Sequence, residues 1–387
     1  MNPGIRSNII SLYLIKFSKW FNLVMPVVVL FYQDNGLSMQ DIFLLKSIYS
    51  VAIVLMEVPT GYMADVWGRK PSLLTGAVLG AAGFALYSFS HGFFAFAVAE
   101  VILGIGHSFV SGSDSAMLYD TLKAAGQEKK YIKQEGWITS SGNFAEAFAG
   151  ICGGLLAAVS LRLPFYFQFG IAAIAVPAAL FLKEPQLHAR ELAHNFGSIL
   201  ATVRQTLLHA EMRSALLVSA MTGTASLTFA WFVQPYFQEA GLPVSMFGIM
   251  WTLLNLSVGF SSVFSYKAEH ALGQRKSLYV IIAGLSLCYF LAAWEISFAG
   301  MAILFVFYLI RGMAHPILKD YLNQYTQSDV RATILSLRDL IIRINFAVVG
   351  PVLGYITDHY SLGSALLAAG VSYLVLALAA ALPLLKK

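Results

Sequence analysis

Charged residues and cysteines are both scarce in this sequence. Asp, Glu, Lys and Arg make up only 12% of its 387 residues, while 58% are hydrophobic. An ordinary soluble domain carries about 25% charged residues, because charged side chains cover its outer surface. The two cysteines, Cys152 and Cys288, both lie within apolar stretches, so we infer neither a disulfide nor a metal site. The scarcity of charge indicates that the surrounding solvent is lipid.

Several enzyme signatures are also missing. The sequence has no G-x-x-x-x-G-K-[ST] phosphate loop, no G-x-S-x-G nucleophile motif and no H-E-x-x-H zinc motif. We therefore expect no enzyme activity, no cofactor and no ATP-driven transport. A non-transporting membrane receptor is a remote alternative, because a fold does not by itself fix a function.

Long apolar runs dominate the chain. Only helices and closed barrels satisfy their backbone in lipid, and a spanning helix needs about 20 residues. The runs predict twelve spanning helices, near residues 8–33, 42–64, 71–90, 92–122, 135–158, 163–182, 213–236, 243–266, 277–296, 299–325, 333–357 and 361–385. We therefore expect an all-α membrane protein with a six-helix bundle over 1–182, a polar linker over 183–212 and a second six-helix bundle over 213–387.

Lysine and arginine are distributed unevenly between the predicted loops. If the chain begins in the cytoplasm, one set of loops contains Arg69, Lys70, Lys123 to Lys133, the linker, Arg275, Lys276, Arg331, Lys386 and Lys387. The opposite loops contain almost only Arg162. The positive-inside rule then predicts that both termini are cytoplasmic. This distribution accounts for the net charge of +5 without a nucleic-acid partner. The first run is too long and too polar for a cleaved signal peptide.

Two weak internal repeats relate the halves. "GIGHS", with Gly104 and His107, is echoed 208 residues later by "GMAHP", with Gly312 and His315. Asp65, Gly68, Arg69 and Lys70 are echoed at an offset of 204 to 206 by Glu269, Gly273, Arg275 and Lys276. Duplicated halves around a site at the membrane midplane are typical of secondary transporters.

The stretch "GYMADVWGRK" carries a family resemblance. Its Gly61, Asp65, Gly68, Arg69 and Lys70 match the G-x-x-x-D-x-x-G-R-K signature between helices two and three of the major facilitator superfamily. The sequence resembles that superfamily over essentially its whole length, and in motif it is most similar to the twelve-helix drug:proton antiporters. Gly61 would allow a close helix contact and Gly68 a tight turn. The resemblance implies that Asp65 helps to latch the two halves; a simple basic turn set by topology is the alternative.

Ionisable side chains within the predicted spans are candidates for function, because charge at bilayer depth is costly. Glu100, His107 and Asp114 recur every seven residues on the fourth predicted helix, which places them on one stripe. We expect them to take part in proton coupling. The resemblance implies that helices one, four, seven and ten line a cavity. The cations expected to bind substrate there are Lys16, Arg311, His315 and Lys319. Structural ion pairs between helices are the alternative.

Two features depart from the drug antiporters. Those proteins usually place an arginine four residues before a glycine in helix four, where this chain has Glu100 before Gly104. Their G-P-x-x-G-G pattern in helix five reads "AGICGG" here, from Ala149 to Gly154, without the proline. Both departures weaken the antiporter assignment and leave the superfamily assignment intact.

Taken with the resemblance, these patterns predict a multidrug- or metabolite-exporter-like transporter. We expect it to move a small organic molecule by alternating access, with a proton gradient as driving force. We expect a monomer, embedded in the lipid of a bacterial inner membrane. The alternative is a symporter or exporter of a specific anionic metabolite or siderophore, which Lys16, Arg311 and Lys319 favour.

Overall fold

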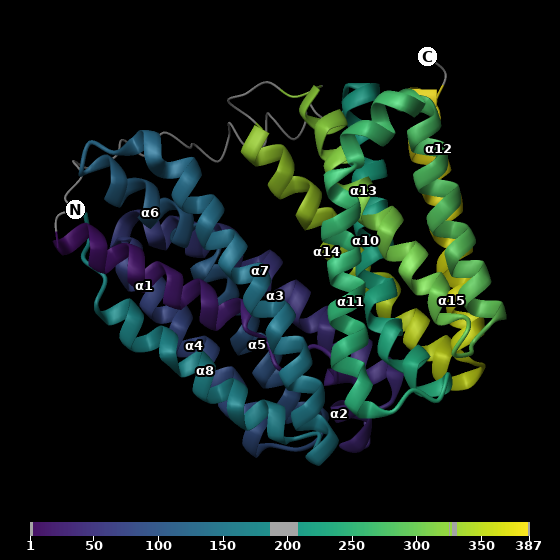
Figure 1. Cartoon of the computed structure of the whole chain (residues 1–387), viewed down its shortest axis with the longest axis horizontal. Helices are drawn as coiled ribbons and strands as arrows, with labels where there is room; N and C mark the ends of the chain where they lie inside the picture. Colours follow the sequence, from purple (N-terminus) through teal and green to yellow (C-terminus); the bar gives the residue numbers. More distant parts are fainter. Residues whose placement is uncertain (1–2, 186–207, 325, 327–330, 386–387) are drawn as a thin grey trace. The chain divides into compact units, whose positions relative to one another are not determined.

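The computed structural model describes residues 3–185, 208–324, 326 and 331–385 (Figure 1). All regular structure in this part of the chain is helical. Eleven helical stretches within it are long and apolar enough to cross a membrane. Each of the twelve predicted segments coincides with one helix or with a broken pair of helices, which confirms the all-α membrane fold. Of the predicted linker, residues 186–207 lie outside the described residues.

The helices form two compact units. Unit 1 comprises Met1–Leu37, Leu44–Glu191 and Val244–Thr252. Unit 2 comprises Ser38–Phe43, Leu192–Pro243 and Leu253–Lys387. Ser38–Phe43 is thus grouped with unit 2 and Val244–Thr252 with unit 1, so the units do not follow the chain order strictly.

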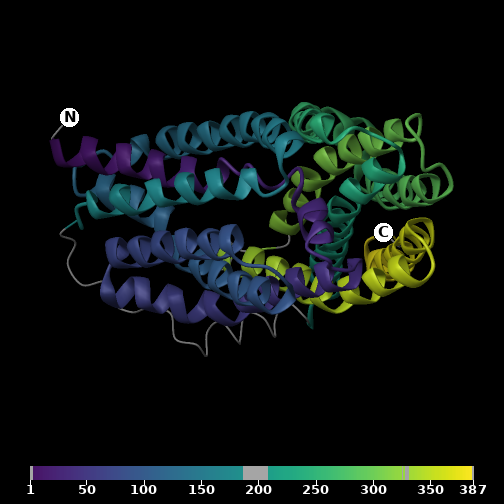
Figure 2. The same cartoon turned by 90° about the horizontal axis from the view of Figure 1, so that it is seen from below.

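Unit 1 is built around tightly packed apolar helices. They are α1 (Pro3–Trp20), α2 (Val28–Asp34), most of α3 (Met39–Trp67), α4 (Arg69–Phe89), α5 (Phe93–Val110), α6 (Ser113–Lys123), the short 3₁₀ helix η1 (Glu128–Lys130), α7 (Tyr131–Val159) and α8 (Leu163–Leu180). Helix α4 packs against α5 and α8, and α1 packs against α7 and α8. Figure 2 shows the purple α1 alongside the teal α7 and α8. Leu12, Leu73, Met117, Leu118 and Ala179 belong to the buried core that joins α1, α4, α6 and α8.

The first predicted helix, 8–33, is wrong as a single element. Residues 21–27 separate α1 from α2, and Pro26 within them has no N–H for a helical hydrogen bond. The break is sealed inside the protein, because the Leu23 N–H donates to Gln168 Oε1 at 2.8 Å. Helix α7 approaches this segment so closely that a Cβ on Gly153 would collide with the Leu23 backbone. Gly153 of "AGICGG" therefore makes room for an irregular backbone.

The fourth predicted helix, 92–122, is also divided. Helix α5 ends at Val110 and α6 begins at Ser113, because Gly112 adopts the left-handed conformation with φ 75° and ψ −29°. Residues with a side chain rarely adopt this conformation. The break lies between His107 and Asp114, so the expected continuous stripe of Glu100, His107 and Asp114 is interrupted before its third member.

Unit 2 is also built of long helices that pack against one another. It contains α10 (Ala210–Glu239), the greater part of α11 (Val244–Val263), α12 (Ser265–Trp294), α13 (Met301–Gln324), α14 (Arg331–His359) and α15 (Leu362–Leu385). Helix α15 packs against α10 and α12, and α12 also packs against α13. In the core, the Phe229 and Phe307 rings stack with centroids 3.7 Å apart, and Tyr289 meets Phe229 edge-on.

The backbone carries the repeat that the sequence only suggests. Gly68 has φ 102° and ψ 163°, and Gly273 has φ 72° and ψ 168°, so the same unusual turn occurs once in each unit. A Cβ on Gly104 of α5 would clash with α3, and a Cβ on Gly312 of α13 would clash with α11. The two sequence offsets therefore correspond to equivalent positions in two related units.

Candidate functional site

The turn that connects α3 to α4 is capped by a carboxylate from a distant segment. The N–H groups of Arg69 and Lys70, at the start of α4, donate to the two Glu184 carboxylate oxygens at 2.8 and 2.7 Å. A carboxylate at a helix N-terminus satisfies unpaired N–H groups and stabilises the helix dipole. A Cβ on Gly68 would lie 3.0 Å from Glu184 Oε1. Gly68 is thus required both for its positive φ and for the space that Glu184 occupies.

Arg69 links three helices through its guanidinium group. It lies 2.6 Å from Asp65 Oδ1 on α3 and 3.9 Å from Asp120 Oδ2 on α6. Lys70 Nζ donates to the Leu180 carbonyl at 2.8 Å, at the end of α8. All these partners belong to unit 1. The latch between halves that the resemblance implies for Asp65 stays a prediction.

Gly61 does not make the close helix contact expected of it. It is exposed on α3, and no described atom lies within 4 Å of the position where its Cβ would stand. A glycine is therefore not required at this position by packing among the described residues. The two glycines of the signature thus differ in role. Gly68 lies in a turn that requires a positive φ, and Gly61 lies on an exposed face of α3.

Glu100 lies at the centre of a buried cluster from four helices. Its Oε1 accepts hydrogen bonds from Tyr32 of α2 at 2.9 Å and from Tyr87 of α4 at 2.7 Å. Lys46 of α3 forms an ion pair with the same oxygen and also donates to the Tyr32 hydroxyl at 2.9 Å. The Glu100 side chain is only 2% exposed and that of Lys46 is 12% exposed. The negative charge is therefore compensated within unit 1 by one ammonium and two hydroxyl groups.

This cluster was only partly predictable. Lys46, Tyr32 and Tyr87 were not singled out from the sequence, although Lys46 is the one cation in the predicted helix 42–64. An intramembrane lysine should have a nearby carboxylate, and that expectation alone would have marked Lys46. His107, one further predicted site residue on α5, lies 3.2 Å from the Tyr49 hydroxyl through Nδ1.

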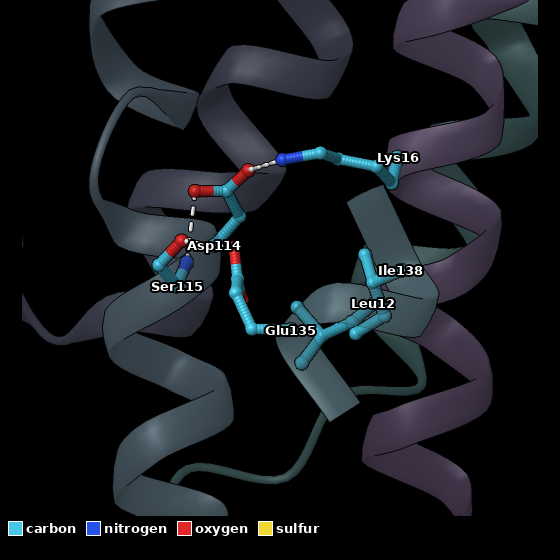
Figure 3. Close-up of a pocket in the computed structure, with 6 residues that line it drawn as sticks. All are labelled: Leu12, Lys16, Asp114, Ser115, Glu135 and Ile138. Carbon is cyan, nitrogen blue, oxygen red and sulfur yellow. Dashed lines mark hydrogen bonds and ion pairs between the residues drawn. The ribbon is translucent and has the colours of Figure 1, made fainter. Parts of the chain in front are cut away.

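A second ionic cluster lines a small pocket between α1, α6 and α7 (Figure 3). Lys16 Nζ lies 3.3 Å from Asp114 Oδ2. The Ser115 N–H donates to Asp114 Oδ1 at 2.8 Å, and its hydroxyl donates to Glu135 Oε1 at 2.9 Å. Leu12 and Ile138 complete the lining. Two carboxylates and one ammonium share this pocket, which leaves one excess negative charge.

The structure thus brings together residues that the sequence assigned to different tasks. Lys16 was expected to bind substrate and Asp114 to carry protons, yet they are ion-pair partners with side chains 14% and 15% exposed. Glu135 was not singled out, because it stands at the polar beginning of a predicted helix. Sequence reasoning could not have paired it with Ser115 without knowing that α7 packs beside α6.

In unit 2, a cationic face runs along α13. Arg311, His315 and Lys319 are four residues apart, which places them on one side of the helix. On α14, Arg338 Nε donates to the Ser219 hydroxyl at 2.6 Å, and its Nη1 lies 2.9 Å from Asp339 Oδ1. His315 lies within electrostatic range of all four charged groups, namely Arg311, Lys319, Arg338 and Asp339.

Comparison with known proteins supports a transporter. The YxaM protein of Bacillus subtilis (strain 168), an uncharacterised MFS-type transporter, is 21% identical over 368 residues, covering 90% of this chain and 89% of that protein. The quinolone resistance protein NorA of Staphylococcus aureus (strain MRSA252) is 24% identical over 165 residues, which is 42% of each chain.

Solved structures give the same fold. A mutant of the nucleoside transporter NupG superposes with a TM-score of 0.82 at 15% identity, over 97% of this chain and 98% of that one. A bacterial homologue of the human lysosomal transporter Spinster, in an inward-facing and unoccupied conformation, gives a TM-score of 0.77 at 16% identity, over 99% and 96%. The family model for the Major Facilitator Superfamily matches residues 11–344. Together with the two related helical units and the turn at Gly68, this match shows that the chain belongs to the Major Facilitator Superfamily, a family of transporters and not of enzymes.

Proposed function

We propose that this protein is a proton-coupled secondary transporter that exports a small organic molecule by alternating access. The observation that carries the proposal is the pocket in which Asp114 and Glu135 share Lys16 and Ser115. Two carboxylates near a single ammonium leave one negative charge unbalanced, and one proton neutralises it.

The Asp114 pocket is better suited to proton exchange than the Glu100 cluster. A proton carrier needs access to water, and the Asp114 side chain is 15% exposed in a pocket, against 2% for Glu100. Glu100 is also enclosed by three donors, the Lys46 ammonium and the Tyr32 and Tyr87 hydroxyl groups. We therefore assign proton exchange to Asp114 with Glu135 and a structural role to Glu100.

Export is supported by the similarity to NorA, whose name describes quinolone resistance. That similarity covers less than half of each chain, so it supports the direction only and not the substrate. We further propose an inner-membrane location with both termini in the cytoplasm, on the strength of the uneven loop cations. A monomer suffices, because two six-helix units make a complete pathway in this architecture.

Proton movement in liposomes tests the coupling. Purified protein is reconstituted, a pH gradient is imposed, and proton flux is recorded with a pH-sensitive dye while anionic, neutral and cationic compounds are added. We expect one class of compound to drive proton flux in the wild type, and Asp114→Asn to abolish that flux. Glu128→Gln is the matched control, because Glu128 is exposed in η1. Accumulation of a compound without any proton movement would show that the proton coupling is wrong.

A further inference from the structure

We propose that unit 2 contains an anion-binding site formed by Arg311, His315, Lys319 and Arg338, and that the transported molecule is an organic anion. This inference rests on the transport function proposed above and adds the chemical class of the substrate. The recognised group would be a carboxylate, sulfonate or phosphate.

The first support is the depth of Arg311. It lies near the middle of α13, a 24-residue helix that is long and apolar enough to span a membrane. A charged side chain at this depth costs several kcal/mol unless it faces protein or water. Arg311 is half-buried, while His315 and Lys319 on the same face are exposed. Lipid would be an unfavourable neighbour for these groups, so we infer that the face borders a water-filled path.

The second support is the lack of charge compensation in unit 2. In unit 1, Lys16 and Lys46 each pair with a carboxylate. Among the described residues, neither Arg311 nor Lys319 has a carboxylate within ion-pair distance. Arg311 instead places its guanidinium group over the Tyr308 ring, 5.1 Å from the centroid. The uncompensated cations would be neutralised by an anionic ligand.

The third support is the local excess of positive charge. His315 has three permanent cations in its electrostatic surroundings, Arg311, Lys319 and Arg338, against the single carboxylate of Asp339. Asp339 is 60% exposed and already bonded to Arg338, so it screens the others weakly. An organic cation would be repelled from this face.

The fourth support is the orientation of the arginines. Arg338 is fixed by Ser219 of α10 and by Asp339, with a side chain only 13% exposed. The Arg311 guanidinium group lies over the ring of Tyr308, a fully buried residue, in cation–π contact. The guanidinium group is planar and offers N–H donors that match a carboxylate or phosphate. Restricted side chains also lose less entropy when a ligand binds.

Binding to the purified protein tests the proposal without any gradient. The probes share one ring and differ in charge: benzoate, benzenesulfonate and phenyl phosphate as anions, benzyl alcohol as neutral, and benzylamine as cation. At equal ionic strength, the midpoint of thermal unfolding is followed in detergent by tryptophan fluorescence. We expect at least one anion to raise the midpoint saturably, with no comparable effect from benzyl alcohol, benzylamine or added chloride. Equal effects of anion and neutral probe, or an effect that chloride reproduces, would overturn the proposal.

Variants then locate the site. Arg311→Gln should weaken anion binding at least tenfold, and Arg311→Lys should weaken it less, because lysine keeps the charge and loses the planar fork. Lys267→Gln is the control, because Lys267 is an exposed cation of α12 in the same unit that contacts the Phe264 ring. If Arg311→Gln fails to fold, the proposal is tested by anion binding to Arg311→Lys and by the comparison of the charged and neutral probes on the wild type. Unchanged anion affinity in a folded Arg311 variant would remove Arg311 from the site.

The outcome is separable from that of the proton-coupling test. Asp114→Asn should still bind the anion, because Asp114 lies in unit 1. Anion binding without proton movement would leave this inference standing and refute the coupling. Proton movement driven only by benzylamine would support the coupling and refute the anion site.

Discussion

At the scale of single residues, Glu100 shows how a charge is held in an apolar environment. Three donors converge on one carboxylate oxygen, and two of them are tyrosine hydroxyl groups whose oxygens lie 2.7 Å apart. The Tyr87 ring stacks on Phe96 with centroids 5.2 Å apart. Both the charge and the packing around it would be disturbed by removing any member.

Glu100→Gln should therefore destabilise the protein by about 3–5 kcal/mol, because it removes the carboxylate that pairs with the largely buried Lys46 ammonium. The unfolding midpoint in detergent measures this loss. A second change, Lys46→Met, should restore a large part of the stability in the Glu100→Gln background. A Glu100→Gln protein as stable as the wild type, with proton flux abolished, would instead favour a proton carrier at Glu100.

Gly68 and Gly61 provide a matched pair within the signature. Gly68→Ala puts a side chain on a residue with φ 102°, and its Cβ would lie 3.0 Å from Glu184. It should therefore lower the free energy of unfolding by about 1–3 kcal/mol and disturb the α4 cap. Gly61 lies in a helix, and a Cβ added there would have no described atom within 4 Å. Gly61→Ala should therefore leave the free energy of unfolding unchanged or raise it by about 0.5–1 kcal/mol. Thermal unfolding of both variants checks the contrast, and equal losses would contradict it.

At the scale of elements, the ends of helices are stabilised by carboxylates from elsewhere in the chain. Glu184 caps α4, and in unit 2 Asp358 accepts from the N–H groups of Met39 and Gln40 at 2.9 and 2.8 Å, at the start of α3. Each cap satisfies two of the N–H groups that a helix leaves unpaired. The helix ends are thereby tied to segments far away in sequence.

Glu184→Ala should lower the free energy of unfolding by about 0.5–2 kcal/mol, because the α4 cap is lost. Glu184→Gln should cost less, because an amide oxygen still accepts one of the two N–H groups. Hydrogen exchange at Arg69 and Lys70 measures the effect locally, with Glu128→Ala as an exposed control. Unchanged hydrogen-exchange rates at Arg69 and Lys70 in Glu184→Ala would show that water replaces the carboxylate cap without loss of local stability.

The elements were predictable to the extent that they depend on local composition. Apolar length alone located the spans, because lipid requires helices of a minimum length. The sequence does not predict the helix breaks at residues 21–27 and at Gly112. The apolar runs continue across both breaks, although the helical backbone ends there. The Lys46–Glu100 and Ser115–Glu135 contacts were missed for another reason: they join residues that only helix packing brings together.

At the scale of the whole molecule, the loop cations predict the orientation in the membrane. In a Cys152→Ser, Cys288→Ser background, a single cysteine at Lys129 should react with a membrane-impermeant reagent only from the cytoplasmic side. A single cysteine at His91, in the exposed turn before α5, should react only from the opposite side. The reverse pattern in intact cells would overturn the orientation derived from the loop cations.

Gly68 and Gly273 share a backbone conformation, while the charges on the two units have diverged. The two units therefore share this turn while their charged side chains differ: Lys16 and Lys46 of unit 1 each pair with a carboxylate, and Arg311 and Lys319 of unit 2 have no described carboxylate within ion-pair distance. The two halves are no longer interchangeable. Under the roles proposed above for Asp114 and Arg311, substrate selectivity and proton coupling could be engineered separately, because the relevant substitutions fall in different units.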